Sequence, residues 1–279
     1  MNGMRTISGA TRFGGLIGRG LSHSLSPLIH NTAAAILGID AVYHAFDLSD
    51  APGEAFFDLM LTANCYGFNV TLPYKEVIAE RLSRHLARPL LTANTLVARG
   101  SHWEVTSTDA DGFCAGLGEI GRKLADFAGI ICMGYGGAAK ALLQKIRAEL
   151  PGCPIWVLRR TPNAQEQAMA GVHFVDFNVE ALTTILRQCP NALLIQGTSS
   201  PLRGDPLERF VPALAYLQGA FVDLVYGTPS ALLMAAAQRK IPCQDGIPML
   251  IHQALLSQKL WWGQSAEFSA IKAALAARA

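Results

Sequence analysis

Residues 128–150 read AGIICMGYGGAAKALLQKIRAEL, and this stretch decides the fold of the second half of the chain. The apolar run before the glycines predicts a buried strand, and the run after them predicts a helix. The turn fits the pattern G-x-G-x-x-G/A: Gly134 allows a tight turn, Gly136 lets backbone N–H groups approach a pyrophosphate, and Ala139 permits close packing of helix on strand. The stretch therefore predicts a Rossmann-type dinucleotide-binding domain.

The end of the next predicted strand indicates which dinucleotide binds. About 20 residues past such a turn, NAD-binding proteins carry an acidic residue for the ribose 2′-hydroxyl. Here the sequence reads 159-RRTP-162, so this position has no acidic residue and carries Arg159 and Arg160 instead. Guanidinium groups pair strongly with phosphate, which favours NADP over NAD. The alternative is a solvated basic turn.

The first hundred residues predict a second α/β domain. Short apolar runs alternate there with helical patterns, which indicates a parallel or mixed sheet covered by helices. We expect Ser26 to be the N-cap of the first helix, with Pro27 at its first position. The predicted strands are 14–18, 42–48, 66–72, 95–99 and 102–106, and the predicted helices are 26–38, 52–63 and 73–86.

The rest of the chain completes an α/β protein of two domains. Helices are predicted over 108–121 and 246–263, the latter packing back across the domain boundary, and strands over 154–160, 173–177, 192–198 and 220–227. We therefore expect an N-terminal mixed-sheet α/β substrate domain, made of 1–107 and 246–279. A Rossmann-type dinucleotide-binding domain is expected over 108–245.

Composition excludes several classes of protein. Hydrophobic residues make up 51% of the 279 and charged residues 16%, which is typical of a folded chain rather than a disordered one. The net charge of +2 and the absence of a dense Lys/Arg cluster favour neither a nucleic-acid nor a membrane partner. No signal-peptide-like or membrane-spanning run is present, so a cytoplasmic location is predicted. The six cysteines lack CxxC pairs and the seven histidines lack HExxH spacing, which predicts reduced thiols and no metal.

Several polar residues stand at the ends of apolar segments. Lys75 follows the predicted strand in 68-FNVTLPYKE-76 and lies at the N-terminus of the next predicted helix. A cation is mildly unfavourable there, because this is the positive end of the helix dipole. Ser24 and Ser26 are placed to hold a carboxylate near a helix N-terminus, although simple capping by Ser26 is the competing interpretation. The other such residues are Thr71, Asn94, Asp109 and Gln253. Convergence of such groups is how a small polyol acid would be bound.

Six motifs in one order give the chain a resemblance to the shikimate dehydrogenase family, which interconverts 3-dehydroshikimate and shikimate. The match covers nearly the whole chain. The motifs are HSLSPLIHN (23–31), FNVTLPYKE (68–76), ANTLV (93–97), STDADGF (107–113), GYGGAAKAL (134–142) and DGIPMLIHQA (245–254). The resemblance implies an NADP-dependent oxidoreductase of chorismate and aromatic amino acid biosynthesis. The sequence leaves the choice between a monomer and a homodimer open.

The resemblance also implies roles for individual residues. Lys75 and Asp109 match the catalytic pair, and Lys75 would exchange a proton with the C3 oxygen of the substrate. The implied substrate-binding residues are Ser24 and Ser26 for the carboxylate, Thr71, Asn94 and Gln253 for the hydroxyls, and Tyr226 near the nicotinamide. The implied cofactor-binding residues are Gly134, Gly136, Gly137, Ala138, Arg159, Arg160, Thr161, Gly246 and Met249.

Departures from the family pattern keep two alternatives open. Arg159 replaces an Asn, Ser107 replaces another Asn, Pro248 replaces a Gly, and the segment after Tyr226 is short. The first alternative is oxidation of quinate, which has one more hydroxyl on the same ring, so few residues need differ between the two activities. Members of the family that use quinate tend to carry Thr at the position of Ser26, so Ser26 favours shikimate. A non-catalytic ring-acid sensor would not need both Lys75 and Asp109.

Overall fold

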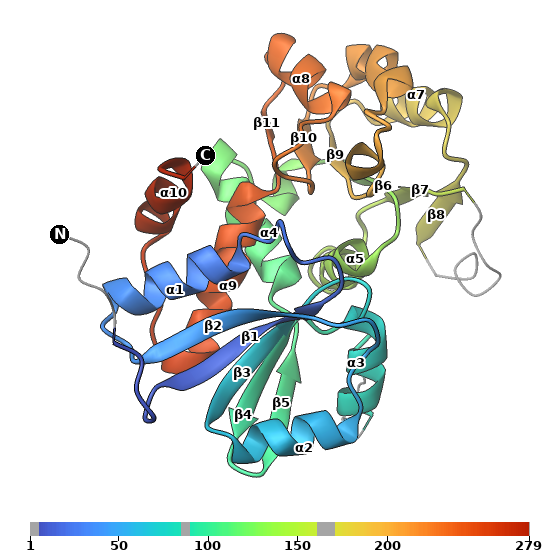
Figure 1. Ribbon diagram of the computed structural model, residues 1–279. Helices are drawn as coiled ribbons and strands as arrows, with labels where there is room; N and C mark the ends of the chain where they lie inside the picture. Colours follow the sequence, from blue (N-terminus) through green and yellow to red (C-terminus); the bar gives the residue numbers. More distant parts are fainter. Residues whose placement is uncertain (1–5, 85–89, 161–170, 279) are drawn as a thin grey trace. The chain divides into compact units, whose positions relative to one another are not determined.

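The computed structural model describes residues 6–84, 90–160 and 171–278 (Figure 1). The chain divides into two compact units, one of residues 1–112 with 251–279 and one of residues 113–250. The sequence places the domain boundaries after residues 107 and 245. A mixed sheet in the first unit and a parallel sheet in the second confirm the predicted two-part α/β class.

The first unit is built on a five-stranded sheet with the order β2-β1-β3-β4-β5. β1 pairs in parallel with β2 and β3, whereas β4 pairs antiparallel with β3 and β5. The strands are β1 (Arg12–Gly18), β2 (Ala41–Asp47), β3 (Cys65–Val70), β4 (Thr95–Arg99) and β5 (His102–Thr106). The helices are α1 (Ser26–Ile36), α2 (Glu54–Thr62), α3 (Lys75–Ser83) and α10 (Phe268–Ala276). Two further helices, α4 (Asp109–Leu117) and α9 (Ile247–Trp262), run through the division between the units.

Successive side chains of a strand point to opposite faces of the sheet. Helices cover both faces, so the side chains on each face are buried. On one face Phe68 packs with Phe57 of α2 and Ile78 of α3. On the other face Tyr43 packs with Trp261 of α9. Figure 1 shows α2 and α3 together on one side of the sheet, with α1 and α9 on the other.

The second unit is built on a six-stranded parallel sheet with the order β11-β10-β9-β6-β7-β8. The strand order reverses between β6 and β9, and open sheets of this kind bind ligands beyond the carboxyl ends of the strands at such a point. The strands are β6 (Gly129–Met133), β7 (Ile155–Leu158), β8 (Val172–Val175), β9 (Ala192–Gln196), β10 (Ala220–Asp223) and β11 (Cys243–Gln244). The main helices are α5 (Gly137–Glu149), α7 (Val179–Gln188) and α8 (Ala231–Gln238), with a 3-10 segment η4 (Glu208–Tyr216).

The structure corrects the predicted cap of the first helix and, in the part of the chain it describes, contains three α-helices that were not predicted. Leu25, not Ser26, is the N-cap of α1; Ser26 is the first helical residue and its side chain makes no capping hydrogen bond. The backbone N–H of Ser26 donates instead to Ser24 Oγ at 3.3 Å, so the earlier serine satisfies the helix end. Helices α7, α8 and α10 had no counterpart in the predicted elements. Over the described ranges, no helix has the length and apolar character needed to cross a membrane.

His30 lies on the buried side of α1 and is fully enclosed. Its ring stacks on Tyr43 with centroids 4.3 Å apart and lies 5.1 Å from the ring of Trp261. Its Nδ1 is 3.5 Å from the side-chain nitrogen of Gln258. Burial lowers the pKa of His30 from 6.5 to about 3, and the side chain of Asn69 acts weakly in the opposite direction. His30 is therefore neutral in the folded protein at neutral pH.

The free energy of unfolding should fall on mild acidification because of His30. In the unfolded chain the imidazole takes up a proton below pH 6.5, whereas in the folded protein it stays neutral down to about pH 3. The stability that this neutral histidine preserves above pH 6.5 is therefore lost as the pH falls from 6.5 towards 3. Between pH 7.5 and 5.0 we expect His30 to account for a loss of about 2 kcal/mol.

Urea unfolding of wild type and His30→Leu at the two pH values measures this contribution. The variant should be less stable at pH 7.5 but should lose less of its stability at pH 5.0. Tyr43→Phe alters the neighbouring ring without removing the histidine, and it should keep the wild-type difference. Equal losses on acidification in wild type and His30→Leu would contradict the assignment.

Candidate functional site

Lys75 and Asp109 form a buried ion pair at the beginnings of two helices. Lys75 is the first residue of α3 and Asp109 the first residue of α4. Lys75 Nζ lies 2.5 Å from Asp109 Oδ2, and the side chains are 12% and 5% exposed. The carboxylate suits the positive end of its helix, and it compensates the unfavourable position of the lysine at the end of another. The pair therefore explains why a lysine can stand directly after the strand and turn that precede α3.

The turn before Lys75 is fixed by backbone and side-chain hydrogen bonds. The N–H of Thr71 donates to the carbonyl of Ile17 in β1, and the N–H of Tyr74 donates to the carbonyl of Thr71. The Tyr74 hydroxyl donates to the carbonyl of Leu48 at 2.7 Å. A Cβ on Gly18 would lie 2.5 Å from the Thr71 methyl group, so a glycine at the end of β1 lets this turn approach. The position of Lys75 is thus set by the strands that precede it.

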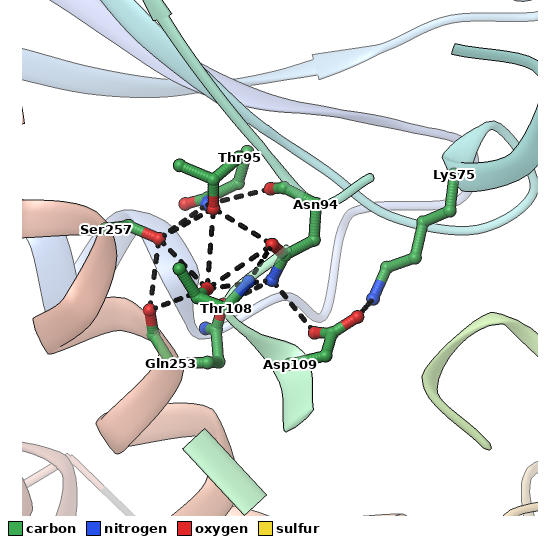
Figure 2. Close-up of polar contacts among 8 residues, drawn as sticks. Lys75, Asn94, Thr95, Thr108, Asp109, Gln253 and Ser257 are labelled. Atoms are coloured by element: carbon green, nitrogen blue, oxygen red, sulfur yellow. Dashed lines mark hydrogen bonds and ion pairs between the residues drawn. The ribbon is translucent and has the colours of Figure 1, made fainter. Parts of the chain in front are cut away.

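Asn94 joins the ion pair to Gln253. Its Nδ2 donates to Asp109 Oδ1 at 2.9 Å and lies 3.1 Å from Gln253 Oε1. Its Oδ1 accepts the backbone N–H of Thr108 at 2.7 Å. Asp109 therefore has a donor on each carboxylate oxygen, from Lys75 and from Asn94, and its orientation is defined (Figure 2).

A cluster of hydroxyl groups behind Asn94 was missed by the sequence reasoning. Figure 2 shows the side chains of Thr95, Thr108 and Ser257 converging beside Asn94 and Gln253. Thr95 Oγ1 and Ser257 Oγ are 2.9 Å apart, and Thr108 Oγ1 donates to the carbonyl of Gln253 at 3.0 Å. Asn69 Nδ2 donates to Ser257 Oγ at 3.0 Å. The motifs around residues 69, 95 and 108 contained the only signal, and nothing in them indicated Ser257.

The two predicted carboxylate-binding serines lie in the loop before α1. Ser24 lines an open pocket of about 430 Å³ together with Ser22, Pro27, His44 and Asp47. The Asp47 carboxylate holds this loop by accepting the backbone N–H groups of Gly20 and Leu21, at 2.8 and 2.9 Å. Ser26 is 6% exposed at the start of α1. The structure thus brings Lys75, Asn94, Asp109 and Gln253 into one hydrogen-bonded group, while Ser24 belongs to the neighbouring loop.

In the second unit, the glycine-rich turn joins β6 to α5 as predicted. Gly134 has a φ of +96°, which favours glycine, and its N–H donates to the carbonyl of Leu158. Gly136 is the N-cap of α5, and a Cβ placed on it would meet no atom within 4 Å. Gly137 and Ala138 form the first turn, which contains no acidic residue. This open space at a helix N-terminus fits the pyrophosphate of a dinucleotide.

Arg159 and Arg160 follow β7 and line a pocket beside that turn. The pocket has a volume of about 280 Å³, and its other lining residues are Gly134, Tyr135, Leu158, Phe177, Thr198 and Ser200. Two guanidinium groups at the end of the second strand fit a phosphate on the ribose, the group that distinguishes NADP from NAD. Thr161, also predicted for this site, lies outside the described residues.

A buried carboxyl group supports the far wall of this pocket. Gln196 Oε1 accepts the backbone N–H of Thr198 at 2.6 Å, and Gln196 Nε2 donates to Asp223 Oδ1 at 3.2 Å. Burial raises the pKa of Asp223, and hydrogen bonds from Ser230, Val225 and Gln196 act in the opposite direction. The sequence reasoning identified none of these residues, because polar groups inside apolar strands give no periodic signal.

The remaining candidates, Tyr226, Gly246 and Met249, belong to the second unit. Gly246 precedes α9, and a Cβ there would collide with the backbone oxygen of Leu224, so glycine is required by packing. Met249 packs against the apolar cluster that contains Phe113 and Leu117. Both positions thus have a structural reason for their residue type, alongside the role that the resemblance implies.

The fold and the two sites together define a class: a dinucleotide-binding α/β protein with a buried lysine–aspartate pair in its other unit. Residues 16–96 match the model of the shikimate dehydrogenase substrate binding domain. A shikimate dehydrogenase (NADP(+)) of Synechocystis sp. is 31% identical, with 98% of this chain and 97% of that protein covered. One from Shouchella clausii is 32% identical, covering 91% and 94% of the two chains.

A solved structure leads to the same family. The shikimate 5-dehydrogenase of Thermus thermophilus, in complex with NADP(H) and shikimate, superposes with a TM-score of 0.79 at 29% identity. The comparison covers 96% of this chain and all of that one, 100%. The chain belongs to the shikimate dehydrogenase family, as the six motifs predicted.

The contact between Asn94 and Asp109 predicts a pH-dependent loss of stability in the variant Asn94→Asp. The substitution replaces a donor with a second carboxylate oxygen, 2.9 Å from Asp109 Oδ1 in a buried position. We expect the free energy of unfolding to fall by about 3 kcal/mol at pH 7.5, because two buried like charges face each other. The loss should be smaller at pH 5, where the pair can share a proton.

Urea unfolding at both pH values provides the measurement. Ser257→Ala is the matched control, since it removes a hydroxyl from the same cluster without adding charge. It should cost about 1 kcal/mol at either pH. If Asn94→Asp behaved like this control at both pH values, the described contact between Asn94 and Asp109 would be wrong.

Proposed function

We propose that this protein catalyses the reversible NADPH-dependent reduction of 3-dehydroshikimate to shikimate. The observation that carries the proposal is the buried Lys75–Asp109 pair, hydrogen-bonded through Asn94 to Gln253. Relatives named shikimate dehydrogenase (NADP(+)) match nearly the whole chain, which supports the same substrate and cofactor here. The reaction would belong to chorismate and aromatic amino acid biosynthesis.

Lys75 is the proposed proton-transfer group. An ammonium has three N–H donors, so the contact with Asp109 leaves donors for a substrate oxygen. Lys75 gives a proton to the C3 oxygen when the carbonyl is reduced, and takes it back when the hydroxyl is oxidised. Asp109 holds the ammonium in position, and Asn94 holds Asp109. The chemistry therefore depends on the orientation of one carboxylate.

The remaining polar residues of the first unit would bind the substrate. Asn94 and Gln253 offer side-chain amides, and Thr71 a hydroxyl, for the ring hydroxyls. Ser24 and Ser26 would hold the carboxylate through their hydroxyls and the nearby helix end. Tyr226, from the second unit, is proposed for the substrate side of the nicotinamide.

The second unit supplies the proposed cofactor site. NADP, when bound, supplies the hydride acceptor for oxidation and NADPH the donor for reduction. The residues proposed to hold it are Gly134, Gly136, Gly137 and Ala138 at the pyrophosphate, Arg159, Arg160 and Thr161 at the 2′-phosphate, and Gly246 and Met249 near the nicotinamide. Backbone N–H groups at the start of α5 and two guanidinium groups meet the phosphates.

The proposed partners are this small-molecule substrate and NADP. Trp261, in the apolar C-terminal region, is buried against the sheet of its own unit, so it has an intramolecular role. A monomer or homodimer in the cytoplasm stays the prediction for the state of the protein.

Absorbance of reduced nicotinamide at neutral and alkaline pH tests the function directly. Shikimate and quinate would each be offered with NADP and with NAD. We expect fast reduction of NADP with shikimate alone, because Ser26 and the two arginines favour this pair. Turnover with quinate or NAD would keep the mechanism but contradict the specificity, and NADP binding without turnover of either acid would contradict the enzyme.

The role of Lys75 predicts a selective loss of catalysis in Lys75→Ala. We expect kcat to fall about 10³-fold, since a positioned proton-transfer group contributes on this order. The dissociation constant of NADP, measured by fluorescence titration, should stay within about twofold of wild type, because the glycine-rich turn belongs to the other unit. Lys145→Ala is the matched control, because it removes a partly exposed ion pair with Glu149 on α5. Wild-type turnover in Lys75→Ala would exclude the proposed role.

A further inference from the structure

The aromatic side chain in the glycine-rich turn makes contacts that the dinucleotide motif does not require. Tyr135 occupies the first variable position of 134-GYGG-137 and lines the pocket of Arg159 and Arg160. The guanidinium carbon of Arg159 lies 5.9 Å from the centroid of its ring. The ammonium of Lys140, in the first turns of α5, lies 5.4 Å from the same centroid. Two cations from different elements therefore meet one ring at the wall of the pocket.

The ring of Tyr135 is itself held in place. It meets the ring of Phe174 in β8 edge to face, with centroids 5.3 Å apart and an interplanar angle of 86°. Tyr135 also packs against the buried apolar cluster on this face of the parallel sheet. An aromatic ring with two rotatable side-chain bonds, packed on one edge, has a defined orientation. It can therefore serve as a fixed support for a longer, more flexible side chain.

We propose that Tyr135 is a positioning residue for the 2′-phosphate of NADP, acting by holding the Arg159 guanidinium on the wall of the pocket. This inference rests on the proposed NADP dependence. An arginine side chain has many rotamers, and ordering it on binding costs affinity. A guanidinium that already lies over an aromatic face loses less freedom when it meets the phosphate. Tyr135 thus contributes to the choice of NADP over NAD without contacting the phosphate itself.

The charges around the ring agree with an anionic ligand. Arg159, Arg160 and Lys140 bring three positive side chains to one end of the sheet, where α5 also presents its positive end. The first turn of α5 contains no acidic residue. A helix N-terminus with cations beside it suits the phosphates of a dinucleotide.

Binding measurements on fragments of the cofactor test the proposal independently of catalysis. Isothermal titration of 2′,5′-ADP and 5′-AMP separates the 2′-phosphate from the rest of the nucleotide. In Tyr135→Ala we expect affinity for 2′,5′-ADP to fall about fivefold, the value of a cation–π contact, with 5′-AMP unchanged. Tyr135→Phe keeps the ring and should retain the wild-type ratio of the two affinities. Arg159→Gln should reduce the affinity for 2′,5′-ADP further, by about 30-fold, because it removes a charged hydrogen-bond donor to phosphate.

The double variant Tyr135→Ala/Arg159→Gln distinguishes positioning from a structural role. If Tyr135 acts through Arg159, the double variant should bind 2′,5′-ADP no more weakly than Arg159→Gln alone. Additive losses, or equal losses of 2′,5′-ADP and 5′-AMP in Tyr135→Ala, would overturn the proposal. Thermal unfolding of Tyr135→Ala and Tyr135→Phe confirms that the compared proteins are folded. Failure to turn over shikimate would contradict the proposed function but would leave these binding results intact.

Discussion

The first unit depends on satisfying a buried carboxylate at Asp109. A buried charge is tolerated only when it is paired and hydrogen-bonded, because desolvation penalises the ionised form. Asp109 is buried, and its carboxylate oxygens accept hydrogen bonds from Lys75 on one side and Asn94 on the other. These partners come from the segments after β3 and before β4, so the sheet must bring three chain segments together before the pair can form. The same arrangement that satisfies the carboxylate therefore also positions the lysine.

The hydroxyl cluster extends this constraint into the core. Asn94 can hold Asp109 only if its own amide is fixed, and Thr108, Thr95 and Ser257 surround it. Ser257 comes from α9, so a helix late in the chain takes part in the geometry of a residue before β4. A buried polar network of this kind specifies one arrangement, because any other leaves donors or acceptors unsatisfied.

The second unit places its charges differently. Its two arginines and the N-terminus of α5 stand at a pocket that suits an anionic ligand.

Sequence patterns predicted the elements well where periodicity was strong. The strands β4 and β5 have the predicted bounds, 95–99 and 102–106, and the glycine-rich turn lies between strand and helix as expected. The patterns failed for α7, α8 and α10, short helices beyond the recognised motifs, and for the cap of α1, where Ser24 rather than Ser26 accepts the first N–H. Within the site, Ser257 could not be predicted. Its partner Thr95 is 162 residues away, and no local spacing encodes that contact.

The departure at Pro248 can be judged from its place in the helix. It is the second residue of α9, where a backbone N–H has no partner within the helix, so proline removes nothing that the helix uses. The N–H of Ile247 is satisfied by Asp245 Oδ1 at 3.0 Å, and the preceding Gly246 keeps the close approach to Leu224. Proline here fixes the backbone at the start of the helix that carries Met249 and Gln253. The substitution is therefore compatible with the local structure, and it stiffens the segment that leads to both proposed binding residues.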